Sequence, residues 1–209
     1  MAEAFKRNDF SYIADIYRRS CLNQFIIGAF LFGGIWINID KILIILGPEY
    51  AGAKWVIFFI GLGYLIDMLT GANAHIIAYS KHYRVALYFL IGLIILVIAA
   101  ILLLVPVWGI TGAAVAIAAS FAINNLLRFC FLKWKYNMQP FTVKMLVMAV
   151  VFLVSVAAAT LLPTFSLIPD LIIRSIIFTL IFGVLTIRLN ISEDVSNLFG
   201  EMIKKLFKL

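Results

Sequence analysis

The residue best placed to do chemistry in this sequence is Asp67, a carboxylate set inside a long apolar stretch. It carries the one formal charge between Lys54 and Ser80. At ~1.5 Å per helical residue, Asp67 lies roughly 20 Å from either end of that stretch. A charge near the middle of a bilayer is costly, so an intramembrane acid is by default a candidate functional group. Asp67 could hold a proton or a cation; alternatively, it is a neutral carboxyl that holds two helices together.

Its neighbours on the same helical face are small or weakly polar, which favours a position inside a helix bundle or a wet cavity. Two candidate partners, Asn124 and Asn125, lie at a similar depth, with Asn124 ~6 Å nearer the basic side. Arg128 is roughly 12 Å nearer that side, so we expect no direct ion pair with Asp67. Asn73 lies one to two turns beyond Asp67 in the same segment.

Other kinds of site find little support in the sequence. The two histidines, His75 and His82, and the two cysteines, Cys21 and Cys130, form no metal-ligand or disulfide pattern. No Gly-x-Ser-x-Gly, phosphate-binding loop or pair of intramembrane carboxylates is present. We therefore expect no enzyme activity, no cofactor and no metal site.

The elements that must position Asp67 follow from composition. Of 209 residues, 65% are hydrophobic and 13% charged, with a mean hydropathy of +1.10. This composition is typical of a polytopic membrane protein, and we predict an all-α bundle. The net charge of +7 is spread over short segments between apolar runs, which indicates membrane topology rather than nucleic-acid binding.

The hydropathy pattern predicts about six transmembrane helices between two amphipathic ends. Residues 1–20 form a basic amphipathic lead-in, and residues 191–209 form an amphipathic interfacial tail. Gly47-Pro48 and the 106–109 turn are helix stops. The six predicted spans are residues 21–46, 52–79, 85–105, 110–132, 143–162 and 170–189.

Three spans have features that bear on packing. Gly112, Ala116 and Ser120 recur every four residues, which predicts a close-packing face. Residues 85–105 are apolar on nearly every side and are expected to face lipid. Arg174 lies one turn inside the last span, from where we expect it to snorkel outward.

The basic residues are distributed unequally between alternate turns. Lys41, Lys54 and Arg174 are the three that belong to one side, and the other fourteen of the 17 belong to the opposite side or its helix ends. The positive-inside rule then predicts that both termini are cytoplasmic.

The order of short motifs resembles a known family. Residues 46–53 read LGPEYAGA, 66–73 read IDMLTGAN, 80–84 read SKHYR and 105–114 read VPVWGITGAA. In this order they resemble the carboxyl-terminal half of bacterial polysaccharide flippases, the O-antigen and lipopolysaccharide exporters of the multidrug/oligosaccharidyl-lipid/polysaccharide superfamily. The resemblance covers residues 1 to 145 well, and residues 146 to 209 match as two further helices.

The resemblance implies a transporter in the bacterial inner membrane for cell-surface polysaccharide synthesis. Its substrate would be an undecaprenyl-diphosphate-linked oligosaccharide, carried to the outer leaflet by alternating access. Family members have two helical lobes around a central cavity, so this chain would supply the last six helices and need an amino-terminal lobe or a partner subunit. A diphosphate calls for cationic donors, supplied by the other lobe or, near the entrance, by Arg84 and Arg128. The expected substrate or ion pathway comprises Asp67, Asn73, Asn124, Asn125, Arg84 and Arg128.

Two alternatives stay open at this point. A sister branch exports small cationic drugs in exchange for protons or sodium, which would suit Asp67. A chain without transport activity could instead be a membrane scaffold that self-associates through Gly112, Ala116 and Ser120.

Overall fold

The protein is predominantly helical in the part that the computed structural model describes, residues 2–164 and 166–197, where no strand occurs. Many of its apolar side chains lie along long helices and outside any compact core, as the hydropathy predicts. The elements are α1 (Ala2–Lys6), α2 (Phe10–Trp36), α3 (Ile39–Leu46), the 3₁₀ helix η1 (Pro48–Ala53), α4 (Lys54–Thr70), α5 (Asn73–Tyr79), α6 (Tyr83–Tyr136), α7 (Val143–Thr160) and α8 (Leu167–Arg188).

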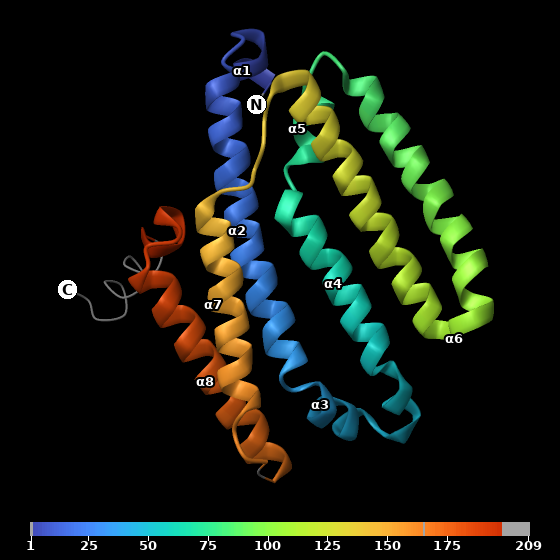
Figure 1. Ribbon diagram of the computed structural model, residues 1–209, viewed down its shortest axis with the longest axis vertical. Coiled ribbons are helices and arrows are strands. Elements are labelled where there is room, and N and C mark those ends of the chain that lie inside the picture. The colour runs from blue at the N-terminus through green and yellow to red at the C-terminus, as the bar shows by residue number, and fades with distance from the viewer. Residues whose placement is uncertain (1, 165, 198–209) are drawn as a thin grey trace.

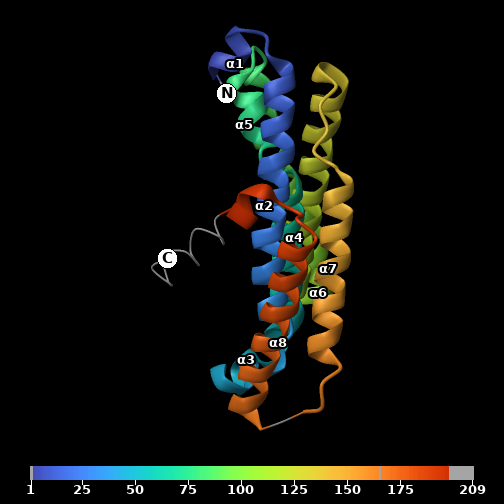
Figure 2. The same ribbon diagram turned by 90° about the vertical axis from the view of Figure 1, so that its left-hand side faces the viewer.

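Helix α2 runs through the middle of the molecule (Figure 1). The α7–α8 hairpin packs on one side of it, and α4 with α5 packs on the other. Helix α6 covers the far side of α4 and α5. Figure 2, turned by 90°, shows that the molecule is much thinner in the perpendicular direction.

Long apolar helices with exposed side chains identify the chain as membrane-embedded. Four described stretches are long and apolar enough to cross a bilayer: Pro48–Thr70, α6, α7 and α8. The bent pair α2 and α3 is a fifth if it counts as one span. Large side chains such as Leu103 and Ile110, both 72% exposed, face outward from these helices. Such a surface is stable in lipid, so the predicted all-α polytopic bundle is confirmed.

Helix α6 is folded back on itself at Gly109. The backbone there is non-helical, with φ 56° and ψ −136°, a conformation that favours glycine. Figure 1 shows the two arms, 83–108 and 110–136, running side by side in opposite directions. Each arm corresponds to one predicted span, so α6 supplies two of the six apolar segments.

Two predicted spans are not continuous helices. The predicted span 21–46 is broken after Trp36, and α3 leaves α2 at 60°. The Asn38 side chain ends α2 by donating from Nδ2 to the carbonyl oxygen of Gly34 at 2.9 Å. The predicted span 52–79 is likewise broken, at Gly71 and Ala72, between α4 and α5.

The second half of the amphipathic lead-in continues into the first long helix. Residues 10–20 belong to α2, and the apolar residues Ile13 and Tyr17 are fully buried in the protein. Asp9 starts α2 by accepting a hydrogen bond from the Tyr12 amide. Of the predicted tail, residues 193–197 are helical, and residues 198–209 lie outside the described part of the chain.

The ends of the long helices alternate between the two ends of the molecule (Figure 1). The α5–α6 and α6–α7 connections lie at the same end as α1. The α3–η1 region, the Gly109 turn and the α7–α8 connection lie at the opposite end, which we call the distal end. Lys41, Lys54 and Arg174 belong to elements at the distal end, whereas Arg7, Lys81 and Arg84 belong to elements or connections at the opposite end.

Candidate functional site

The break between α4 and α5 creates the setting for Asp67. Gly71 sits in the break, where a Cβ atom would collide with the Oε1 atom of Gln24 on α2. The missing side chain leaves room for the Gln24 amide against the backbone of the break. The break lies one turn beyond Asp67.

Asp67 is the end of a short chain of hydrogen bonds that joins α4, α6 and α5. Asn125 donates from Nδ2 to Asp67 Oδ1 at 2.8 Å. Asn73 in turn donates from Nδ2 to Asn125 Oδ1 at 3.0 Å. Asn125 and Asn73 are 2% and 1% exposed, whereas Asp67 is half-buried. The carboxylate is therefore partly accessible at one end of this row, and the two amides behind it are buried. We call the three hydrogen-bonded side chains, those of Asp67, Asn125 and Asn73, the Asp67 chain.

Buried polar atoms without partners adjoin the Asp67 chain along the sequence. In the described part of the molecule, Asn73 Oδ1 and Thr70 Oγ1 have no hydrogen-bond partner. A buried polar atom without a partner is costly, so such atoms need a reason to be retained. Each of these two oxygens can accept a hydrogen bond that no described residue donates.

The neighbouring Asn124 faces a different partner. In the amide orientation that satisfies both its polar atoms, it donates to the carbonyl oxygen of Phe89 at 3.1 Å and accepts from Arg128 Nη2 at 3.2 Å. Phe89 is on the first arm of α6, so Asn124 ties the two arms together. Asn124 is therefore not in the Asp67 chain, and of the two adjacent asparagines only Asn125 reaches Asp67.

The two candidate arginines differ in their relation to Asp67. No ion pair joins Arg128 to Asp67 among the described residues. Arg84 is exposed at the start of α6, where its guanidinium lies 5.9 Å from the ring centre of Tyr83. The structure thus brings together Asp67, Asn73 and Asn125, with Arg128 nearby and Arg84 apart.

The predicted packing face of Gly112, Ala116 and Ser120 is buried inside the chain. A Cβ atom on Gly112 would collide with the carbonyl of Leu104 on the first arm of α6. Ala116 and Ser120 are both 0% exposed. Because the first arm of α6 covers this face, it is not a surface through which a scaffold could self-associate.

A second close approach holds α6 against α4. Here a Cβ atom on Gly63 would lie 2.9 Å from the Cα atom of Ala118. Ala118 is two residues away from Ala116 and so on a different side of the helix. The second arm of α6 is thus packed on both sides by small residues.

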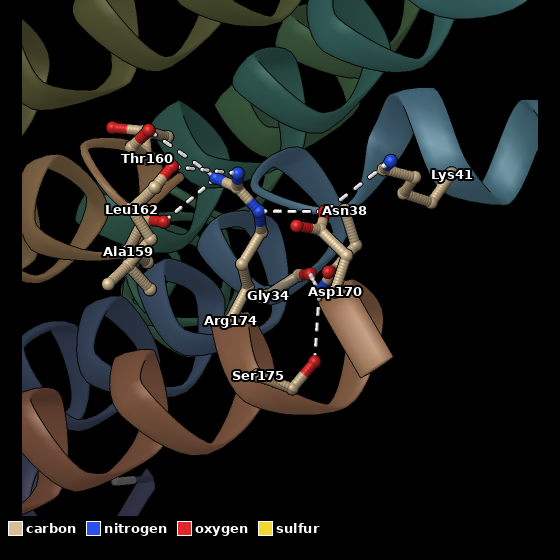
Figure 3. Close-up of polar contacts among 9 residues, drawn as sticks. All are labelled: Gly34, Asn38, Lys41, Ala159, Thr160, Leu162, Asp170, Arg174 and Ser175. Carbon is tan, nitrogen blue, oxygen red and sulfur yellow. Dashed lines mark hydrogen bonds and ion pairs between the residues drawn. The ribbon is translucent and has the colours of Figure 1, made fainter. Parts of the chain in front are cut away.

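Sequence reasoning missed a charged cluster at the distal end (Figure 3). Arg174 Nε donates to Asp170 Oδ2 at 2.8 Å, and Lys41 Nζ lies 3.7 Å from the same oxygen. Asn38 Nδ2 donates to Ser175 Oγ at 2.9 Å, which links the end of α2 to α8. The i,i+4 spacing of Asp170 and Arg174 was the available signal.

Arg174 does not snorkel outward, as the sequence suggested, and is 8% exposed. Its guanidinium donates to the carbonyl oxygens of Ala159, Thr160 and Leu162 at 2.9, 3.4 and 3.2 Å. These carbonyls lie at the carboxyl end of α7, where a cation is favoured by the helix dipole. Arg174 therefore caps α7 and joins it to α8.

Groups of His, Cys, Asp and Glu suited to a metal ion do not occur among the described residues. Comparison with known proteins adds no relative: no family model, curated protein or solved structure matches the sequence. The geometry of the Asp67 chain is accordingly the basis for a functional proposal.

Proposed function

We propose that this chain is part of a transporter that moves lipid-linked oligosaccharide across the bacterial cytoplasmic membrane for cell-surface polysaccharide synthesis. The observation that carries the proposal is the Asp67 chain, a carboxylate and two buried amides next to a helix break inside a membrane bundle. Polar side chains at membrane depth usually belong to a substrate or ion pathway. Transporters commonly place such pathways at interrupted helices.

The substrate class comes from the motif resemblance at residues 46–53, 66–73, 80–84 and 105–114. A diphosphate-linked glycan needs cationic donors along its route. Arg128 is half-buried and donates to Asn124, the residue next to Asn125, so it is a candidate donor beside the pathway. A second lobe or a partner subunit supplies the facing wall and the remaining cations in this proposal.

Asp67 fits the role of coupling group. Its Oδ1 atom accepts a hydrogen bond from Asn125, which holds the carboxylate in one orientation. Proton or cation binding at Asp67 would change the charge of the pathway and so could drive alternation between inward and outward states. The distribution of basic residues predicts how the protein is oriented in the membrane. Both termini are then cytoplasmic, and the distal end faces the outside.

Replacement of the chromosomal copy by Asp67→Asn tests the proposal. We expect surface polysaccharide to fall at least ~10-fold and lipid-linked oligosaccharide to accumulate on the inner leaflet. The Asn side chain has nearly the same shape as Asp, so the substitution removes only the intramembrane charge. Asp15→Asn is the matched control, since Asp15 is exposed and paired with Arg19 at 2.9 Å. Immunoblots with a tag after Leu209 establish that the variants are present at equal levels. The mass of the tagged band also shows whether the second lobe is part of the same polypeptide.

Unchanged polysaccharide in a deletion strain would refute the oligosaccharide assignment. If that strain instead loses resistance to cationic drugs, the cation-coupled exporter becomes the better assignment.

The orientation of the protein in the membrane has a separate test in cysteine-free protein. A membrane-impermeant thiol reagent applied to intact cells should label Ser166→Cys at the distal end and spare Lys81→Cys at the opposite end.

A further inference from the structure

The distal end contains a cavity of about 400 Å³ whose walls are charged. Its lining includes Trp36, Asp40, Lys41, Lys54, Asp170 and Arg174. Three cations and two carboxylates leave one excess positive charge in this lining. The cavity is distinct from the Asp67 chain, which lies between α4, α5 and α6.

The buried wall of the cavity is fixed in place. Arg174 is held by Asp170 and by three carbonyl oxygens of the α7 end, so its position depends on no ligand (Figure 3). Its direct bond to Asp170 at 2.8 Å balances that carboxylate. Lys41, at 3.7 Å from the same oxygen, is beyond good hydrogen-bond distance. The Lys41 ammonium therefore has donor capacity to offer an anion.

The other lysine of the cavity has an exchangeable partner. Lys54 Nζ lies 2.6 Å from Asp40 Oδ1, but the Asp40 side chain is 68% exposed. Exposed ion pairs contribute little to stability, because water competes for both charges. An incoming anion can therefore replace Asp40 as the partner of Lys54, and the Asp40 carboxylate is then hydrated by solvent.

The position of the cavity identifies the anion. Lys54 lies over the ring of Trp36 at 5.8 Å, and Trp55 packs next to Trp36 with ring centres 6.1 Å apart. Tryptophans gather where the hydrocarbon of a bilayer meets its headgroups. Helix α3, bent 60° away from α2, starts at this level. Lipid phosphates occupy this depth of a membrane, and lysines at such a depth attract them.

We propose that Lys41 and Lys54 bind the phosphate of an anionic phospholipid in the distal cavity, with Arg174 as a fixed positive wall. The site goes beyond the transport proposal and does not depend on it. Bound lipid would link α3 to α4 through the two lysines, next to the point where Arg174 joins α7 to α8. The lipid thus stabilises the distal end of the whole bundle.

Purified full-length protein in neutral detergent provides the test. Phosphatidylglycerol, phosphatidylcholine and inorganic phosphate are titrated separately, and binding is followed by native mass spectrometry and by the shift in unfolding temperature. We expect phosphatidylglycerol to bind most tightly and to raise the unfolding temperature. Lys41→Gln and Lys54→Gln should each weaken it about tenfold, as expected for loss of one charge-assisted contact. Lys81→Gln, an exposed lysine at the opposite end, is the matched control.

Equal phosphatidylglycerol binding by the wild type and by both cavity variants would overturn the proposal, as would an equal loss in Lys81→Gln. Stabilisation by inorganic phosphate that Lys41→Gln abolishes would keep the phosphate site and make the free ion its source. The unfolding temperature without lipid checks that each variant is folded. Loss of lipid binding with normal polysaccharide export would separate this site from the transport function.

Discussion

Removal of the Arg174 guanidinium is the sharpest test of the distal cluster. In Arg174→Met the side chain keeps much of its length but loses its charge and its donors. Asp170, which is 1% exposed, would then be a buried carboxylate that has lost its 2.8 Å ion pair with Arg174 and keeps Lys41 at 3.7 Å. The carbonyls of Ala159, Thr160 and Leu162 would also lose a donor.

The expected loss follows from these contacts. Breaking a buried ion pair by removing one partner costs about 3–5 kcal/mol, because the remaining charge stays desolvated. The double variant Asp170→Leu with Arg174→Met removes both charges. It should recover at least ~2 kcal/mol of the loss, since the buried carboxylate that lost the Arg174 guanidinium is removed as well.

The free energy of unfolding is measured in mixed micelles titrated with sodium dodecyl sulfate, followed by circular dichroism. Arg188→Met is the matched control, because Arg188 is an exposed arginine at the other end of α8. A loss in Arg174→Met no larger than in Arg188→Met would refute the role of Arg174. A double variant less stable than Arg174→Met alone would refute the reasoning about the buried charge.

Three further perturbations test the packing and the connections. Gly63→Ala should lower the free energy of unfolding by about 1–3 kcal/mol in the same assay, because its Cβ atom would lie 2.9 Å from the Ala118 backbone. Gly109→Ala should cost about 1–3 kcal/mol, since φ is 56° there; Gly92→Ala, in open space at ordinary φ, is its control. Desolvation and two nearby lysines hold the pKa of His82 below its usual value of 6.5. The unfolded chain therefore binds the proton first, and stability should decrease slightly as pH falls below 6.5, which unfolding curves on either side of that pH will check.

Depth in the membrane was predictable, whereas rotation about the helix axis was not. Helical rise places Asp67, Asn124 and Asn125 at similar depths, and the structure joins Asp67 to Asn125 at 2.8 Å. Adjacent residues on a helix point about 100° apart, so only one of the two asparagines could face α4. Packing of the second α6 arm between α4 and the first arm decided which one.

The two interruptions of helices also differ in whether the sequence predicts them. The reversal at Gly109 was predictable, because Pro106 and glycine impose local backbone limits. The break at Gly71 was not predicted, because the segment from residue 52 to residue 79 is predominantly apolar and contains no proline.

The amino-acid sequence was sufficient for the membrane class, the all-α architecture and the reversal of direction at residues 106–109. These properties depend on local hydropathy and backbone stereochemistry, which each segment carries alone. The tertiary structure decided that Arg174 caps α7, that Lys41 meets Asp170 and that the small-residue face is covered by the chain. Those contacts depend on how the helices pack against one another, which local sequence does not specify. The polar ones are retained because a buried charge is stable only with a partner.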